Sequence, residues 1–252
     1  MKLTFLGTGT GIPQTRAQSG LIMEVITGGQ KKPLLFDCGC GILQRLYESG
    51  YDHRDIDTIF LTHLHLDHVS DLLGLLKANW LVGLTGTHIY GPVGTEEWFD
   101  KLMVLYPYLS DRLDVQITEL TGGTVLMVDD CIIRTAPGIH SVTTIGYRVE
   151  CAGRIAVYTG DTEPCYSLTE LAQGAHVLVH ECAFPLGFEV ENHTTPDMFA
   201  KHISKHPLNV ERLYLTHLYP HMQGHEQEAI DYIRKVFPGE VYIAEDLMQI
   251  DV

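Results

Sequence analysis

The stretch Thr62-His63-Leu64-His65-Leu66-Asp67-His68 decides how this sequence is interpreted. It places three imidazoles and one carboxylate within six residues, between an apolar strand-like run and a helical pattern. Because side chains alternate along a strand, His63 and His65 are expected on one face, while Asp67 and His68 open the helix and can face a second position. Nitrogen and carboxylate ligands of this mix suit Zn²⁺ and, less selectively, Mn²⁺ or Fe. The stretch therefore predicts a metal site.

The composition describes a globular protein with an unusual number of histidines. The 252 residues include 45% hydrophobic and 19% charged residues, which excludes a mostly disordered chain. There are 17 Lys and Arg against 32 Asp and Glu, so the net charge of −15 argues against a general nucleic-acid binder or a protein that binds anionic lipid. Fourteen histidines are consistent with metal chemistry, since His is the commonest metal ligand.

The sequence gives no sign of secretion or of a membrane span. The start MKLTFLGTGTG lacks the pattern of a signal peptide, and the apolar stretch 72–84 is interrupted and too short to cross a bilayer. We therefore expect a cytoplasmic protein without a membrane segment. The six cysteines are sparse and mostly lie in apolar runs, so all six are expected to be reduced and structural.

Strand-like and helical segments alternate along both halves of the chain. This alternation predicts an α/β fold in which two sheets pack together with helices outside. The motif LTHL ends a buried strand at 61–64 and again at 215–218, so each half presents a His at the carboxyl edge of a sheet, where open α/β sheets hold ligands. No linker separates the halves, and we expect a single domain over 1–252. The helices are expected at about 42–49, 66–80, 95–105, 168–174, 196–205 and 226–237.

The H-x-H-x-D-H pattern resembles the metal-binding signature of the metallo-β-lactamase superfamily. Three further candidates, His140, Asp161 and His217, follow in order, each at the end of a strand-like run. The resemblance implies a four-layer αββα sandwich with two mixed sheets and two divalent metal ions, most simply Zn²⁺. It also implies that Asp37 supports a metal-binding His. In the implied site, one ion is held by His63, His65 and His140, the other by Asp67, His68 and His217, and Asp161 bridges the two.

Further motifs are similar to the ribonuclease Z branch, which contains tRNA 3′-processing endonucleases and related phosphodiesterases. They are FLGTGTGIPQTR at 5–16, IYGP at 89–92, TGDT at 159–162, HE at 180–181 and His193-Thr194-Thr195. The resemblance implies that His193 assists proton transfer to the leaving oxygen, a task that suits the pKa of His. Asp67 and His193 are the residues expected to act in catalysis.

Two features depart from that branch. Enzymes that process tRNA typically carry a basic, Gly-rich arm between the third and fourth metal motifs, but here only residues 141–160 separate His140 from Asp161 and two strands occupy them. Cys40 stands where the branch usually has a Glu. Without an arm or a basic patch, a small or flexible phosphodiester is a better substrate than a folded tRNA.

The predicted activity is hydrolysis of small-molecule or short nucleic-acid phosphodiesters by a hydroxide that bridges two ions. Two alternatives share the same ligands, namely a tRNA 3′-processing endonuclease and a thioester or lactone hydrolase. A metal-dependent sensing module is disfavoured because all seven ligand positions are intact. Arg16 and Arg148 are candidate phosphate contacts, and His180 is either a support for the site or a core residue. The apolar stretch 72–84 could form the contact of a homodimer, but burial in the core of the monomer explains it more simply.

Overall fold

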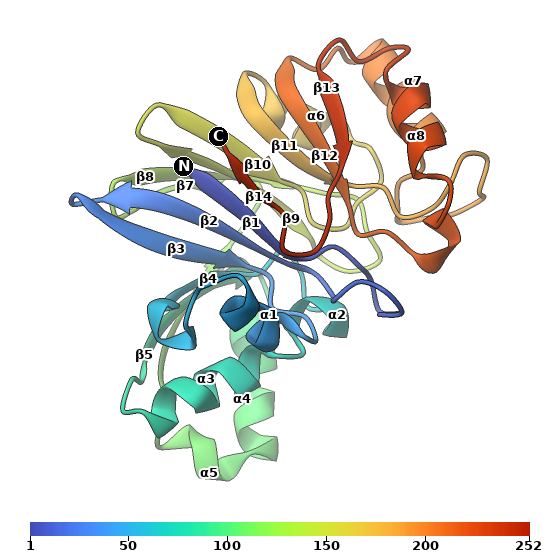
Figure 1. Cartoon of the computed structure of the whole chain (residues 1–252). Coiled ribbons are helices and arrows are strands. Elements are labelled where there is room, and N and C mark those ends of the chain that lie inside the picture. The colour runs from blue at the N-terminus through green and yellow to red at the C-terminus, as the bar shows by residue number, and fades with distance from the viewer.

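Two seven-stranded sheets pack face to face and carry helices on both outer faces (Figure 1). The computed structural model covers residues 1–252. Each sheet contains parallel and antiparallel pairs, which confirms the predicted four-layer αββα sandwich with two mixed sheets. In spatial order, the first sheet consists of β14 (Gln249–Asp251), β1 (Lys2–Gly7), β2 (Gly20–Thr27), β3 (Gln30–Phe36), β4 (Thr58–Phe60), β5 (Gly86–Pro92) and β6 (Asp114–Leu120).

The second sheet is built from the second half of the chain, and the helices divide between the two sheets. Its strands are, in spatial order, β13 (Glu240–Ile243), β12 (Val210–Thr216), β11 (Ala175–Glu181), β10 (Arg154–Tyr158), β9 (Ile145–Cys151), β8 (Cys131–Pro137) and β7 (Val125–Val128). The helices are α1 (Ile42–Glu48), α2 (Leu66–Val69), α3 (Leu72–Leu81), α4 (Thr95–Leu105), α5 (Pro107–Ser110), α6 (Tyr166–Ala172), α7 (Pro196–Lys205) and α8 (Glu226–Ile233), with short 3₁₀ turns at His53–Asp55 and Pro220–Met222.

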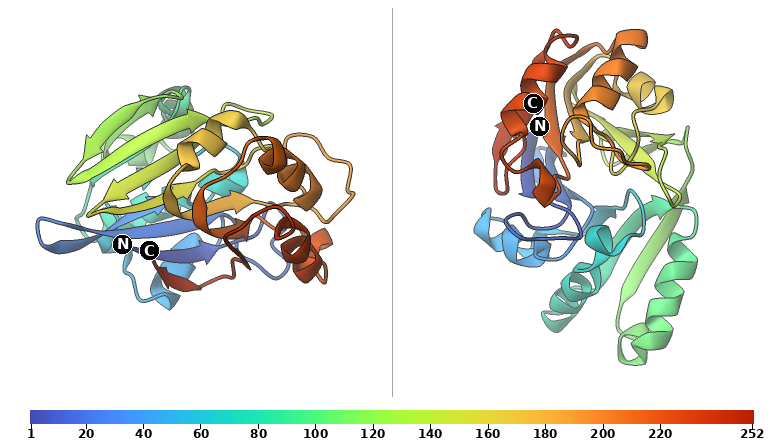
Figure 2. Two further views of the ribbon diagram at one scale, coloured as in Figure 1. Left: turned by 90° about the horizontal axis from the view of Figure 1, so that it is seen from above. Right: turned by 90° about the vertical axis from the view of Figure 1, so that its right-hand side faces the viewer.

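Three apolar layers hold this arrangement together. A central layer between the sheets contains stacked Phe36 and Phe60, with the edge of Tyr147 against both rings. The Tyr147 hydroxyl donates a 2.7 Å hydrogen bond to the backbone oxygen of Leu61, so the second sheet is tied to the first. The outer layers bury α1, α3 and α4 on the first sheet and α7 and α8 on the second. In the right-hand view of Figure 2 the helices of the two halves lie on opposite sides of the sheets.

The helices follow the sequence prediction except around residue 70. Helices at 95–105 and 196–205 are confirmed, and those at 42–49 and 226–237 are confirmed with earlier ends. The single helix predicted over 66–80 is wrong, because the chain breaks into α2 and α3. In a continuous helix the Asp71 amide would donate to Asp67 O. Here the Asp71 amide donates to Cys38 O, and Asp67 O accepts from the Ser19 amide, so this helical hydrogen bond is not formed.

The expectation of six reduced cysteines is wrong for one pair. Cys131 and Cys151 lie opposite each other on β8 and β9 and are joined as a disulfide. Directly opposed residues of an antiparallel pair bring their Cβ atoms close enough for this bond. The other four cysteines are free, with Cys40 exposed and Cys38, Cys165 and Cys182 buried.

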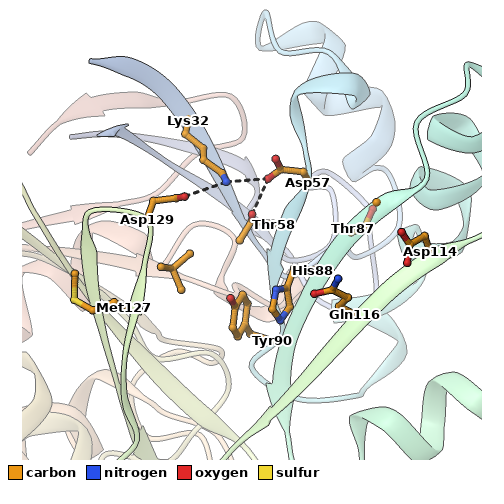
Figure 3. Close-up of a pocket in the computed structure, with 12 residues that line it drawn as sticks. Lys32, Asp57, Thr58, Thr87, His88, Tyr90, Asp114, Gln116, Met127 and Asp129 are labelled. Atoms are coloured by element: carbon orange, nitrogen blue, oxygen red, sulfur yellow. Dashed lines mark hydrogen bonds and ion pairs between the residues drawn. The ribbon is translucent and has the colours of Figure 1, made fainter. Parts of the chain in front are cut away.

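A cleft of about 350 Å³ opens between the sheets, at the amino ends of β4, β5 and β6 (Figure 3). Within it, Lys32 forms ion pairs with Asp57 at 3.3 Å and with Asp129 at 3.0 Å, which links the first sheet to the β7–β8 turn. The ring of His88 stacks on Tyr90 at 4.1 Å. The cleft contains none of the seven predicted metal ligands. None of the helices combines the length and the apolar character that a membrane crossing requires.

Candidate metal centre

All seven predicted ligands come together at the carboxyl ends of strands from both sheets. His63 and His65 follow β4, Asp67 and His68 belong to α2, and the remaining three residues end or follow β8, β10 and β12. They form two groups whose ligand atoms lie within 4.8 Å of one another and which share Asp161. One group is His63, His65, His140 and Asp161; the other is Asp67, His68, Asp161 and His217.

Unusual backbone conformations aim several of these side chains. Asp37 and His217 both have a φ of 57°, which is rare for residues with a side chain. Strain of this kind persists only where the surrounding structure enforces it, and it clusters at functional sites. Gly160, with a φ of 62°, lies against Thr62, and a Cβ there would come within 2.5 Å of the Thr62 side chain. Only glycine therefore lets the chain turn between β10 and Asp161.

The first group has the spacing of a tetrahedral metal site. The His65 Nδ1 atom lies 3.1 Å from His63 Nε2 and 3.1 Å from His140 Nε2. Asp161 Oδ2 lies 3.7 Å from His63 Nε2 and 3.9 Å from His140 Nε2. Zinc–nitrogen bonds of about 2.0–2.1 Å in a tetrahedron would separate the ligand atoms by roughly 3.3 Å. The observed distances fall around this value.

The second group is similarly compact. Asp161 Oδ1 lies 3.3 Å from His68 Nε2, and Asp161 Oδ2 lies 3.1 Å from His217 Nε2. Asp67 Oδ2 completes the group at 4.0 Å from His217 Nε2. Asp161 Oδ2 lies between histidines of both groups, while Oδ1 faces His68 alone, so the carboxylate is placed to contact both groups at once.

Hydrogen bonds behind the histidines fix which nitrogen faces inward. His68 Nδ1 donates to Asp37 Oδ2 at 2.7 Å, and His140 Nδ1 donates to Asn192 O at 2.7 Å. His63 Nδ1 lies 3.0 Å from the Thr62 hydroxyl, and His217 Nδ1 lies 3.0 Å from the Ser19 hydroxyl. In each case Nδ1 is engaged by this partner and Nε2 faces the cluster. Partners of this kind are typical of histidines that bind metals.

Buried polar atoms without hydrogen-bond partners show that the cluster fits a metal. Three such atoms belong to the second group, namely His68 Nε2, His217 Nε2 and Asp161 Oδ1. A buried polar atom without a partner is costly, so polar atoms gathered in this way call for an additional group. Two cations with nitrogen and oxygen ligands would satisfy all of them, and the donor set contains no thiolate.

Burial and charge together suit cation binding. Burial lowers the pKa of His63 well below its usual value and that of His217 to about 4, which keeps both rings neutral and able to coordinate. Burial would also lower the pKa of His68, but the carboxylates of Asp161 and Asp37 outweigh it and raise that pKa well above normal. The interior of the cluster therefore favours a positive charge beside Asp161.

His193 lies at the edge of the cluster and is held by a buried carboxylate. Its Nδ1 donates to Glu181 Oε1 at 2.9 Å, and its ring centroid is 5.1 Å from that of His140 and 5.6 Å from that of His217. Glu181 also accepts from the amides of Thr162 and Thr194. Burial would lower the pKa of His193, but the hydrogen bond and charge of Glu181 raise it. Burial likewise raises the pKa of Glu181, to about 7.

Three other residues from the sequence analysis lie outside the cluster. His180 points to the opposite face of β11, where it packs on Phe199, so it is a core residue and burial lowers its pKa to about 4. The Arg148 guanidinium binds Leu171 O and Gln173 O, which contradicts its assignment to phosphate. Arg16 donates from Nη1 to the Thr8 hydroxyl and the Ala244 carbonyl oxygen, so its role as a phosphate contact stays a prediction.

Asp37 was predicted from the sequence, but the hydrogen-bond partners of His193 and His217 were not. Asp37 contacts His68 as the family resemblance implied. The pairing of Glu181 with His193 was not predicted, although Glu181 ends a buried strand in the same way as several ligands do. For Ser19, a loop residue that contacts His217, the sequence contains no comparable signal.

Comparisons with known proteins agree with this geometry. The family model described as "Beta-lactamase superfamily domain" matches residues 33–218. A ribonuclease Z of Mycolicibacterium gilvum is 32% identical over all of this chain and 96% of that protein. The chain belongs to the ribonuclease Z family of the metallo-β-lactamase superfamily.

Solved structures show the same fold. The metallo-beta-lactamase fold protein YhfI from Bacillus subtilis superimposes with a TM-score of 0.83 at 25% identity, over 99% of this chain and 98% of that one. Human tRNase Z, short form, superimposes with a TM-score of 0.76 at 27% identity, over 100% of this chain and 99% of that one. This ribonuclease Z family member is a metal-dependent hydrolase.

The Asp37→Asn substitution tests the support behind His68. Asn tolerates the positive φ of this position, so the backbone is not strained, but its amide cannot accept as the carboxylate does. We expect metal affinity, measured by competition with a chelator, to fall about 10–100-fold.

The matched control for this prediction is Asp129→Asn. Asp129 has a φ of 52° and lines the cleft of Figure 3, far from the cluster. The control should bind metal as the wild type does. Equal affinities for Asp37→Asn and the wild type would show that the buried carboxylate plays no part in holding metal.

Proposed function

We propose that this protein is a dinuclear-metal hydrolase that cleaves small or flexible phosphodiesters. The observation that carries the proposal is that two ligand groups share Asp161 while the His193–Glu181 pair stands beside them. His63, His65 and His140 would hold one ion, Asp67, His68 and His217 the other, and Asp161 would contact both. Zn²⁺ suits these ligands best.

The metal ions and the protein would have separate tasks. When bound, two divalent cations lower the pKa of water toward neutrality and neutralise charge on a phosphoryl group. Asp67 has a side chain that is 15% exposed, against 3% for Asp161, so it can also meet the attacking water and accept a hydrogen bond from it. That contact would orient the water toward phosphorus.

His193 would protonate the leaving oxygen. Glu181 accepts the hydrogen bond that Nδ1 donates, which leaves Nε2 as the nitrogen that can deliver a proton. The negative charge of Glu181 stabilises the protonated ring, while the His193 side chain stays 15% exposed and Glu181 behind it is fully buried. The P–O bond can then break without releasing a free alkoxide.

The relatives named ribonuclease Z support a nucleic-acid phosphodiester as substrate. The residues between His140 and Asp161 support a short one, because β9 and β10 occupy that segment and leave no room for an arm. The net charge of −15 also disfavours a large polyanion. A precursor tRNA remains the alternative, for which the human tRNase Z similarity is the supporting observation.

We further propose that residues 1–252 form a single domain, since both halves supply ligands to one cluster, and that the protein acts in the cytoplasm. A homodimer is also proposed. The ends of α3 and α4 expose Leu81, Val104 and Leu105 by 66%, 79% and 71%. Contiguous exposed apolar surface is typical of subunit contacts.

Sedimentation at micromolar concentration tests the dimer. We expect twice the monomer mass for the wild type, and the monomer mass for Leu105→Glu, because a buried charge would oppose the contact. A monomeric wild type would rule out the dimer.

Substitutions of Asp161 and His193 separate metal binding from proton transfer. Asp161→Ala should lose bound metal and activity together, whereas His193→Ala should retain about two ions per chain and lose activity by about 10²–10⁴-fold. Metal content by elemental analysis and hydrolysis of a dinucleotide, whose leaving alkoxide needs a proton, measure the two effects. The control His206→Ala removes a histidine at the end of α7 and should alter neither. Full activity in metal-free Asp161→Ala would refute the scheme.

The choice of leaving group sharpens the test of His193. A p-nitrophenolate leaves readily without a proton, whereas a sugar alkoxide needs one. The activity loss of His193→Ala should therefore be much smaller for a p-nitrophenyl ester than for a dinucleotide. Equal losses on both substrates would contradict a role in proton donation.

Competing substrates decide between the candidate functions. The wild type should cleave thymidine 5′-(p-nitrophenyl phosphate) with higher kcat/KM than a thioester or a lactone. It should also leave precursor tRNA uncut at enzyme concentrations that hydrolyse the small ester. Efficient removal of the tRNA 3′ trailer would instead establish the endonuclease alternative.

A further inference from the structure

Three aromatic side chains stand in a parallel stack beside the metal centre. Phe184 and Phe188 belong to the loop between β11 and α7, and Tyr219 follows β12. The Phe184 ring lies between the other two, 4.4 Å from Phe188 at an interplanar angle of 8° and 4.4 Å from Tyr219 at 18°. We call Phe188, Phe184 and Tyr219 the aromatic stack.

The aromatic stack leads from the metal centre to solvent. The Tyr219 ring lies 6.0 Å from His217, centroid to centroid, and His193 lies beside the inner two rings, 5.8 Å from Tyr219 and 6.2 Å from Phe184. Phe184 in the middle is only 8% exposed, while Phe188 at the outer end is 37% exposed. The stack therefore has an open end that can accept another flat group. In Figure 1 the loop that carries Phe188 projects from the body of the molecule between β11 and α7.

Backbone hydrogen bonds hold the aromatic stack in place. Ala183 N donates to Thr194 O at 2.9 Å, and Tyr219 N donates to Ala183 O at 3.0 Å, so the two loops are joined. At the tip, Gly187 N donates to the Asp197 carboxylate at 3.1 Å. A surface ordered in this way binds a ligand without a large cost for immobilising its own side chains.

The charges around the aromatic stack select the kind of group that can bind. Residues 183–195 contain Glu189 and Glu191 and no Lys or Arg, and the basic side chain beside the outer two rings is His221, 5.6 Å from Phe184 and 5.4 Å from Phe188. A phosphate would be repelled here, whereas an uncharged planar ring would gain from stacking. Every nucleobase presents such a face, and stacking on an aromatic side chain tolerates all four bases.

We propose that the aromatic stack is a nucleobase subsite, in which Phe188 stacks on the base of a nucleotide that flanks the scissile phosphate. The subsite rests on the proposed function, since it requires a nucleotide phosphodiester in the metal centre. The enzyme should therefore prefer nucleotide esters to phosphodiesters that carry no base, and it should not discriminate among the bases.

A pair of substrates with one leaving group tests the subsite. Thymidine 5′-(p-nitrophenyl phosphate) carries a base, and methyl p-nitrophenyl phosphate does not. Phe188→Ala should lower kcat/KM for the thymidine ester by roughly 5–150-fold and leave that for the methyl ester within about twofold. Phe188→Leu, which keeps apolar volume but has no aromatic face, should behave like Phe188→Ala, and Phe188→Trp should retain the preference.

The control variant is Tyr166→Ala, which removes an aromatic side chain that is 58% exposed on α6 and lies outside the aromatic stack. It should leave both substrates unaffected, and thermal melting should show that all variants are folded. Equal loss on both substrates, or wild-type behaviour of Phe188→Leu, would overturn the subsite. A wild type with no preference for the thymidine ester would also overturn it while the proposed function stands. Hydrolysis of neither ester would reject the proposed function and the subsite with it.

Discussion

The buried carboxylate of Asp37 is the contact on which the metal centre depends. Its Oδ2 accepts from His68 Nδ1, the Thr62 hydroxyl and the Tyr158 hydroxyl at 2.7 to 2.9 Å, and its Oδ1 accepts from the Thr62 amide. These partners come from the ends of β4 and β10 and from α2, so one side chain joins both sheets at the edge where the ligands gather. A charge at this depth is tolerable only because four donors surround it. The Asp37 carboxylate fixes the orientation of His68 through the hydrogen bond from Nδ1. The Thr62 hydroxyl, which also binds Asp37, lies 3.0 Å from His63 Nδ1 and so links Asp37 to that ring.

The sequence was sufficient to predict the architecture and the metal cluster because both depend on local patterns. Apolar strands that end in His or Asp identify the edge of the sheets, and the order of His63, His140, Asp161 and His217 along the chain matches a known family. The break at residue 70 was not predicted, because it arises when backbone groups of Asp67 and Asp71 bind distant loops. The pairing of Cys131 with Cys151 depends on strand register, which residue types alone did not reveal.

The residues that orient the side chains of the cluster could not be predicted from the sequence. Ser19, Asn192 and Glu181 reach the histidines from loops and strand ends far away in the chain, so their contacts follow from the completed fold. The aromatic stack has the same origin, since Tyr219 and Phe184 are 35 residues apart and meet only when β11 and β12 are paired. The seven residues of the His/Asp cluster could thus be named from the sequence, and the three-dimensional structure added the groups that orient them and the surface beside them.

The last strand of the first sheet comes from the far end of the chain. Residues of β14 pair with β1, and Val252 N donates to Met1 O at 3.0 Å, so the two termini lie side by side (Figure 1). During synthesis on the ribosome, the edge of β1 therefore stays open until residue 251 has emerged. The sheet that begins the chain is the last to be closed, and nascent copies on neighbouring ribosomes each display an unpaired strand in the meantime.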